Sequence, residues 1–222
     1  MSDIKTIDVR ADIIETNDVY TKEVRAFLKE HNTYLINLMA SPGAGKTTTL
    51  IRTINALKDR YKIGVMEADM DSNVDAKLVS ETGSKVIQLH TGGSCHMDAL
   101  MTLDGLKSLG INELDVVILE NVGNLVCPAE FDVGANLRVM ILSVPEGDDK
   151  PLKYPLMFSV SDILLVNKID ALEVFDFDID KLRDNVASLN DDISIYPVSA
   201  LNGDGFDDYI AELARRIEDE GH

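Results

Sequence analysis

Apolar residues recur along this chain as short unbroken runs, and most runs are followed by a stretch in which apolar residues return at helical spacing. The runs have the length of strands that are buried on both faces of a sheet. They cover residues 34–39, 62–67, 85–89, 115–120, 137–144, 163–166 and 193–198. The stretches with helical spacing cover residues 46–60, 97–109, 181–189 and 206–217. This alternation predicts an α/β fold with a mostly parallel, doubly wound sheet.

One further amphipathic segment, residues 19–30, precedes the first predicted strand, and Asn17 is a candidate N-cap for it. We expect this helix to pack on the sheet rather than to serve a partner. The chain shows no internal repeat or low-complexity linker, and 222 residues suit one α/β domain. We therefore expect a single domain over residues 1–222, with a helical extension at 1–32 and a core at 33–219.

A phosphate-binding loop is predicted directly after the first strand. Residues 40–48 read Ala-Ser-Pro-Gly-Ala-Gly-Lys-Thr-Thr between an apolar run and an amphipathic stretch, which is the setting of a P-loop. Backbone amides of such a loop point at the phosphates, Lys46 adds positive charge, and Thr47 can place its hydroxyl on Mg²⁺. Ala40 replaces the usual first glycine, and we expect it to be tolerated. The predicted phosphate-binding residues are Gly43, Ala44, Gly45, Lys46, Thr47 and Thr48.

The strand at 163–166 runs into Asn167-Lys168-Ile169-Asp170, which matches the NKxD motif of GTPases. The carboxylate of Asp170 can accept hydrogen bonds from both N1–H and the exocyclic amine of guanine, and adenine offers no such pair of donors. Lys168 can lie along the plane of the base. The later segment Ser199-Ala200-Leu201 resembles the GTPase motif whose backbone contacts the guanine oxygen. The motifs together favour GTP and GDP over ATP.

Hydrolysis of GTP would require carboxylates near Thr47, because phosphoryl transfer depends on charge neutralisation by Mg²⁺ and on positioning of water. Glu120 ends one predicted strand, and Asp75 follows another. Two further acids in the same segment, Asp69 and Asp71, are alternatives. The expected magnesium ligands are Thr47, Asp75 and Glu120, and the expected catalytic residues are Lys46, Asp75 and Glu120. We expect slow turnover, since no arginine is evidently placed to reach the phosphates.

Composition narrows the choice of partners. The chain has 39 acidic and 21 basic residues and a net charge of -18, which opposes the phosphate backbone of nucleic acid. No apolar run approaches the roughly 18 residues of a membrane span. The first residues show no basic start followed by an apolar stretch, as a secretory signal would. We expect a soluble, cytoplasmic protein with no nucleic-acid or membrane partner.

The two cysteines of the chain suggest a transition-metal site. Cys95 and His96 are adjacent, and Cys127 follows Glu120 in the next loop region. Thiolate and imidazole together suit Ni²⁺ or Zn²⁺, and both loops are expected to leave the same edge of the sheet. Three side chains cannot complete a tetrahedral site, so either water or a second subunit would supply the rest. From the chemistry alone, two buried cysteines and a loop histidine without a metal remain the alternative.

Four strings together resemble the HypB family of GTPases, which help to insert nickel into [NiFe] hydrogenase. They lie at residues 41–47, 95–99, 120–128 and 146–155, and the resemblance spans about residues 35–201. It implies a P-loop GTPase of the SIMIBI class that forms a homodimer with GTP and binds nickel or zinc through Cys95, His96 and Cys127. The implied partners are a hydrogenase maturation factor and the precursor of the hydrogenase large subunit.

Two other interpretations compete with this resemblance. Urease accessory GTPases are related nickel proteins, but their metal motif is Cys-Pro-His, and the Cys95-His96 pair lacks the proline. The other alternative is a non-catalytic module, stabilised by zinc, that keeps a bound nucleotide as a structural ligand. Turnover of GTP that depends on magnesium and is lost in Lys46→Ala would exclude the second alternative.

Overall fold

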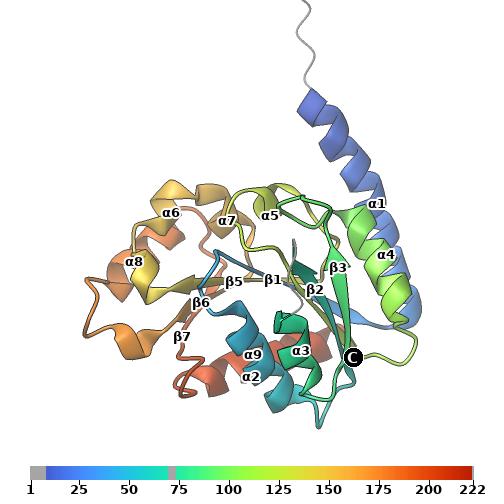
Figure 1. The fold of residues 1–222 in the computed structure, drawn as a ribbon. Helices are drawn as coiled ribbons and strands as arrows, with labels where there is room; N and C mark the ends of the chain where they lie inside the picture. The colour runs from blue at the N-terminus through green and yellow to red at the C-terminus, as the bar shows by residue number, and fades with distance from the viewer. Residues whose placement is uncertain (1–8, 70–73, 222) are drawn as a thin grey trace, which may run out of the picture.

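The computed structural model describes residues 9–69 and 74–221, with side chains for residues 13–68 and 76–221. Seven parallel strands form one sheet in the order β3-β2-β4-β1-β5-β6-β7 (Figure 1). The strands are β1 (Tyr34–Ala40), β2 (Ile63–Asp69), β3 (Lys85–His90), β4 (Val116–Glu120), β5 (Leu137–Ser143), β6 (Ile163–Asn167) and β7 (Ser194–Pro197). Every predicted run is a strand, which confirms the predicted parallel α/β sheet.

Helices cover both faces of this sheet. The longer ones are α1 (Val9–His31), α2 (Lys46–Leu57), α3 (Val74–Ser80), α4 (Ala99–Leu109), α8 (Ile179–Ala187) and α9 (Phe206–Asp219). The shorter ones are α5 (Cys127–Glu130), η1 (Val144–Glu146), α6 (Lys150–Lys153), α7 (Pro155–Val160) and η2 (Ile169–Ala171). Helices α2, α3 and α9 pack on one face, and α1, α4, α7 and α8 pack on the other (Figure 1).

The unbroken apolar runs follow from this double cover. Along β1, Ile36 and Leu38 belong to the core beneath α2 and α9, while Leu35 and Met39 face the opposite layer. All four side chains are buried. Each such side chain stabilises the fold by about 1.5–3 kcal/mol relative to an exposed position, so an alternating polar pattern would be costly here.

Capping residues explain where two helices begin. The predicted helix at 97–109 starts only at Ala99, because the carboxylate of Asp98 accepts a hydrogen bond from the backbone N–H of Met101 at 2.8 Å. Helix α8 starts before the predicted residue 181, since the Asp178 side chain accepts from the backbone N–H groups of Asp180 and Lys181. The segments that form α3, α5, α6 and α7 were not predicted as helices, because each is too short to show helical spacing.

The N-terminal helix packs on the domain, as predicted, but the predicted cap was wrong. Helix α1 begins at Val9, so Asn17 lies inside it and is buried. Its side chain donates to the carbonyl of Asp132 at 2.9 Å and accepts from the backbone N–H of Ala99 at 2.9 Å. Asn17 therefore joins α1 to the start of α4, and these two helices lie side by side (Figure 1).

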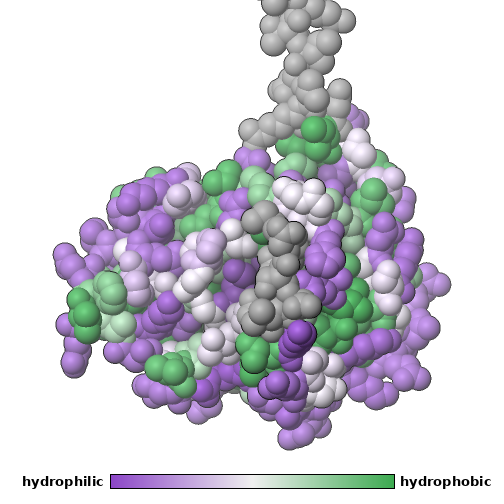
Figure 2. All heavy atoms as spheres, viewed as in Figure 1, coloured by the Kyte–Doolittle hydropathy of each residue, from purple (hydrophilic) through white to green (hydrophobic). Residues whose placement is uncertain are grey.

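The surface agrees with the charged composition. Figure 2 shows a mainly hydrophilic face on which apolar side chains form small separate groups. Within the described residues, every helix is too short or too polar to cross a membrane.

Replacement of Asn17 by alanine should destabilise the domain by about 1–3 kcal/mol, because the buried N–H of Ala99 loses its acceptor. Urea unfolding measures this free energy. Asn55→Ala is the matched control, since Asn55 is exposed and its side chain accepts a hydrogen bond from the exposed Lys58 ammonium. This variant should change the free energy of unfolding by less than about 0.5 kcal/mol. Equal losses in both variants would contradict the role of Asn17.

Candidate nucleotide and metal site

The P-loop lies between β1 and α2, at the carboxyl edge of the sheet. Gly45 precedes α2 with φ of 97°, a conformation that L-residues with a side chain rarely adopt. A Cβ at this position would lie 2.5 Å from Nδ2 of Asn167, so the close packing of the two segments also requires glycine. Ala40 ends β1 without a positive φ, which confirms that this position does not need the usual glycine.

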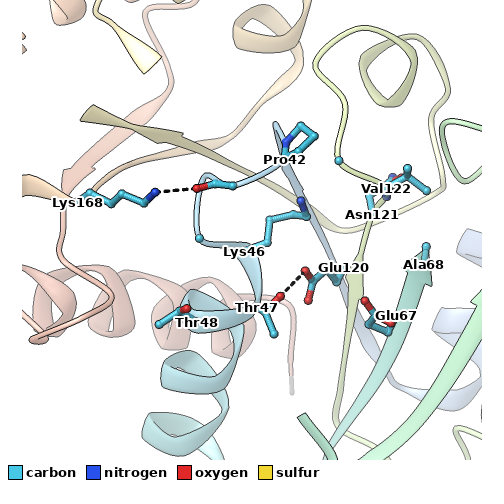
Figure 3. A pocket seen from close by; sticks show the side chains of 13 residues that line it. Pro42, Lys46, Thr47, Thr48, Glu67, Ala68, Glu120, Asn121, Val122 and Lys168 are labelled. Carbon is cyan, nitrogen blue, oxygen red and sulfur yellow. Dashed lines mark hydrogen bonds between the residues drawn. The ribbon is translucent and has the colours of Figure 1, made fainter. Parts of the chain in front are cut away.

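A cavity of about 650 Å³ opens beside this loop (Figure 3). Its wall combines the P-loop and the start of α2 with the carboxyl ends of β2 and β4 and with Lys168. The lining residues are Pro42, Gly43, Gly45, Lys46, Thr47, Thr48, Glu67, Ala68, Glu120, Asn121, Val122, Gly123 and Lys168. A polyphosphate suits this place, because the cavity offers Lys46, Lys168 and the N-terminus of a helix to negative charge.

Two buried carboxylates lie on the other side of the cavity. The hydroxyl of Thr47 donates to Oε1 of Glu120 at 3.1 Å (Figure 3). The register of β2 on β4 places Glu67 directly beside Glu120, and both side chains are nearly inaccessible to solvent. Two carboxylates here would repel the phosphates of a nucleotide. A divalent cation between the carboxylates and the phosphates would remove that repulsion. Carboxylate and hydroxyl oxygens are ligands that fit Mg²⁺.

Glu120 and Thr47 are predicted magnesium ligands, whereas Glu67 is not. The structure brings the first two together, and it adds Glu67 through strand register, for which a single sequence carries no direct signal. The predicted ligand Asp75 lies in α3, with its side chain outside the described residues, as is that of Asp69 at the end of β2. Asp71 lies outside the described residues altogether. These acids stay predictions.

The predicted guanine-binding segments meet next to the P-loop. Asn167 donates from Nδ2 to the carbonyl of Ala44 at 2.9 Å and accepts from the backbone N–H of Ala200 at 2.9 Å. The Ser199 hydroxyl donates to Asp170 at 2.5 Å, which holds that carboxylate in place. Lys168 donates to the carbonyl of Gly43 at 2.7 Å, so here it bridges to the P-loop (Figure 3).

Arg52 holds the backbone of the second predicted guanine-binding segment, residues 199–201. Its Nε and Nη2 donate to the carbonyls of Ala200 at 2.9 Å and Leu201 at 3.0 Å, while the side chain of Leu201 is exposed. Arg52 therefore connects α2, which begins at the phosphate-binding loop, to the segment at 199–201. This tertiary contact has no counterpart in the sequence motifs.

The three predicted metal ligands also come together. One ligand atom from each of Cys95, His96 and Cys127 lies within 4.8 Å of the others. The Cys95 and Cys127 sulfurs are 3.0 Å apart, and Cys95 Sγ is 3.9 Å from Nδ1 of His96. The His96 ring stacks on Phe131 with centroids 4.0 Å apart, which fixes its orientation. Soft sulfur and imidazole donors in this arrangement suit Ni²⁺ or Zn²⁺.

The pKa values in this cluster have physical causes that bear on metal binding. Burial lowers the pKa of His96, so its imidazole stays neutral and able to bind a metal at pH 7. The hydrogen bond with Cys95 is the largest cause that raises the pKa of Cys127, and burial raises it further. The Asn124 side chain opposes this through a hydrogen bond that lowers the pKa of Cys127. A metal ion that binds Cys127 would displace the proton of its thiol.

Comparison with known proteins decides the family. A family model described as the CobW/HypB/UreG nucleotide-binding domain matches residues 34–197. Hydrogenase maturation factor HypB of Rhizobium leguminosarum bv. viciae is 42% identical over 213 residues, which is 96% of this chain and 71% of that protein. The probable hydrogenase maturation factor HypB of Methanocaldococcus jannaschii is 32% identical over 216 residues, 97% of this chain and 98% of that protein. The chain belongs to the HypB family.

Solved structures agree with this assignment to the HypB family. The crystal structure of HypB from Helicobacter pylori in complex with nickel has a TM-score of 0.85 and 36% identity, and the match covers 92% of this chain and 96% of that one. HypB from Archaeoglobus fulgidus gives a TM-score of 0.84 and 35% identity, with coverage of 91% and 99%. The signal recognition particle receptor FtsY from Elizabethkingia anophelis, at 17% identity, a TM-score of 0.53 and coverage of 82% and 65%, shares the fold.

The proximity of the two thiols in this HypB-family protein predicts its response to oxidation. Diamide, which accepts two electrons and two protons, should convert Cys95 and Cys127 into an intramolecular disulfide, because the sulfurs already touch. Intact-mass and peptide analysis should show a monomer that has lost two hydrogen atoms. Prior addition of Ni²⁺ should slow the reaction by occupying the thiolates.

Cys95→Ser is the control for this oxidation, since it leaves one thiol without its neighbour. The intramolecular product should disappear in this variant. If the parent protein formed only disulfides between chains, the thiols would not share one site in solution.

Proposed function

We propose that this chain is a magnesium-dependent GTPase that carries nickel and uses the nucleotide to control it. The observation that carries the proposal is the course of one segment. It begins at Glu120 in the wall of the nucleotide cavity and reaches Cys127 in the metal cluster. We expect a displacement at one end of so short a segment to reach the other end.

The residues proposed to bind the nucleotide divide by the part that they contact. The P-loop from Gly43 to Thr48 binds the phosphates through its amides and through Lys46. Asn167, Lys168 and Asp170 bind guanine, together with the backbone of residues 199–201. The carboxylate of Asp170, held by Ser199, can accept from two donors of guanine, and this pairing distinguishes GTP from ATP.

Magnesium is proposed to bind beside the outer phosphates. Thr47 and Glu120 would hold it, with Glu67 next to them and Asp75 as the further ligand inferred from the sequence. The cation would neutralise charge that develops on the phosphates during transfer to water. Lys46 lines the same cavity and would add positive charge beside the phosphates (Figure 3). Glu67 and Glu120 would keep the cation in place.

Nickel is the proposed cargo, and Zn²⁺ competes for the same donors. Cys95, His96 and Cys127 supply three ligands, which leaves the coordination shell open to water or to a second copy of this chain. The crystal structure of the Helicobacter pylori HypB contains nickel, and this supports the choice of metal. An open site suits an ion that must be released.

Dimerisation and partners complete the proposal. We infer that GTP favours a homodimer and that hydrolysis resets it, so that metal release follows the nucleotide cycle. The names of its relatives, hydrogenase maturation factors, support delivery of nickel to the precursor of a [NiFe] hydrogenase large subunit, with a second maturation factor as partner. A cytoplasmic location is part of the same proposal.

Turnover of GTP tests the enzymatic part. The purified protein should release phosphate slowly from GTP and only with Mg²⁺, and Lys46→Ala should lower kcat/KM by at least about 100-fold because it removes the charge that faces the phosphates. Glu67→Gln should raise the magnesium concentration needed for half-maximal turnover by about 10–100-fold. Phosphate release measured across a magnesium titration gives both values.

Glu113→Gln is the matched control, because Glu113 is an exposed acid outside the cavity lining, and it should behave as the parent protein does. Tight GTP retention without turnover would favour the alternative of a non-catalytic nucleotide-binding module. Turnover that ignores Mg²⁺ or survives in Lys46→Ala would show that this cavity is not the catalytic site.

A further inference from the structure

Asn124 joins three segments that the proposed function requires to act together. Its backbone N–H donates to the carbonyl of Ala40, where β1 enters the P-loop, at 2.9 Å. Its side-chain Nδ2 donates to the carbonyl of Cys95 at 3.3 Å, and its Oδ1 accepts from the backbone N–H of Val126 at 2.8 Å. One residue thus contacts the P-loop, the Cys95 loop and the segment that leads into Cys127.

The residue before Asn124 forms part of the cavity wall. A Cβ added to Gly123 would lie 3.1 Å from Cγ of Pro42 and 3.3 Å from Nζ of Lys46. A phosphate group bound by Lys46 would therefore lie against the backbone of Gly123. Because the peptide that links Gly123 to Asn124 is planar and stiff, a displacement of Gly123 also moves the N–H of Asn124.

Asn121 holds the other end of the cysteine–histidine loop in a fixed position. It is fully buried, and its Oδ1 accepts from the backbone N–H of Met97, the residue after His96, at 3.1 Å. Its Nδ2 donates to the side chain of Asn37 on β1 at 3.1 Å. The loop is therefore anchored to the sheet beyond His96, while Asn124 holds the carbonyl of Cys95. A shift of Asn124 relative to Asn121 changes where Cys95 lies relative to Cys127.

We propose that Asn124 is the positioning residue through which the occupied phosphate site sets the spacing of the metal ligands. It acts through Cys95 and through the backbone before Cys127, and the bond from its side chain to the Cys95 carbonyl is the necessary link. This inference rests on the proposed function, since it assumes that the cavity binds guanine nucleotides and that the cluster binds Ni²⁺. Coupling of two binding equilibria is reciprocal, so nickel must alter nucleotide affinity by the same factor.

Asn124→Asp removes the donor on which the proposed link depends, and with it the hydrogen bond to Cys127. Aspartate has nearly the same shape and can still accept from Val126, but its carboxylate cannot donate to the carbonyl of Cys95. The experiment uses the full chain and measures dissociation constants for GDP and for a non-hydrolysable GTP analogue, with and without saturating Ni²⁺. Asn190→Asp is the matched control, since Asn190 donates to the carbonyl of Ser161 outside the cavity lining and the cluster.

In the parent and in Asn190→Asp, nickel should change the ratio of the two dissociation constants by about five-fold or more. In Asn124→Asp this change should fall below about two-fold, while the affinities without nickel stay close to those of the parent. Asn124→Ser, whose shorter side chain cannot span the distance to Cys95, should give the same loss and serves if the aspartate variant does not fold. A purely structural role would weaken all the affinities together, and nickel would still change the ratio as it does in the parent.

A ratio that responds to nickel in Asn124→Asp as it does in the parent would overturn the proposal. So would a parent protein that binds both ligands but in which nickel leaves the ratio unchanged. Failure of the proposed function looks different, because the parent would then bind no guanine nucleotide or no Ni²⁺ in titrations with each ligand alone.

Discussion

The parallel direction of all seven strands is the constraint on which the rest of the molecule depends. Because the strands run in one direction, the segments that leave their carboxyl ends all begin at the same edge of the sheet. The order β3-β2-β4-β1 places the P-loop, the carboxylates of Glu67 and Glu120 and the loops to both cysteines next to one another there. Neither site is built on one element, so the order of the strands decides which parts of the chain meet in each.

Buried amides hold this edge together without adding charge. Asn167 joins the P-loop to the backbone of Ala200, and Asn121 joins β1 to the loop that carries His96. A carboxamide both donates and accepts, so one side chain can connect two segments. Such bonds are costly to leave unmade in the interior, and they therefore restrict where the loops can lie.

The features that could be predicted from the sequence are those that depend on residues close together along the chain. Strand runs, the P-loop and the grouping of Cys95 with Cys127 were correct, because each follows from a local pattern and from the shared edge of a parallel sheet. Glu67 and Arg52 were missed, since their importance comes from strand register and from a contact across the fold. The cap at Asn17 was wrong because the helix already includes residues from Val9 onward, and the Asn17 side chain bonds to two other segments instead.

Metal binding in different nucleotide states tests the central claim, which is that nucleotide binding and metal binding at this edge are coupled. Ni²⁺ and Zn²⁺ would be titrated into apo protein, GDP-bound protein and protein bound to a non-hydrolysable GTP analogue, while light scattering follows the oligomeric mass. The account predicts that the GTP form becomes a dimer and that its metal affinity or stoichiometry differs from that of the GDP form. Metal binding and mass that are the same in all three states would contradict it.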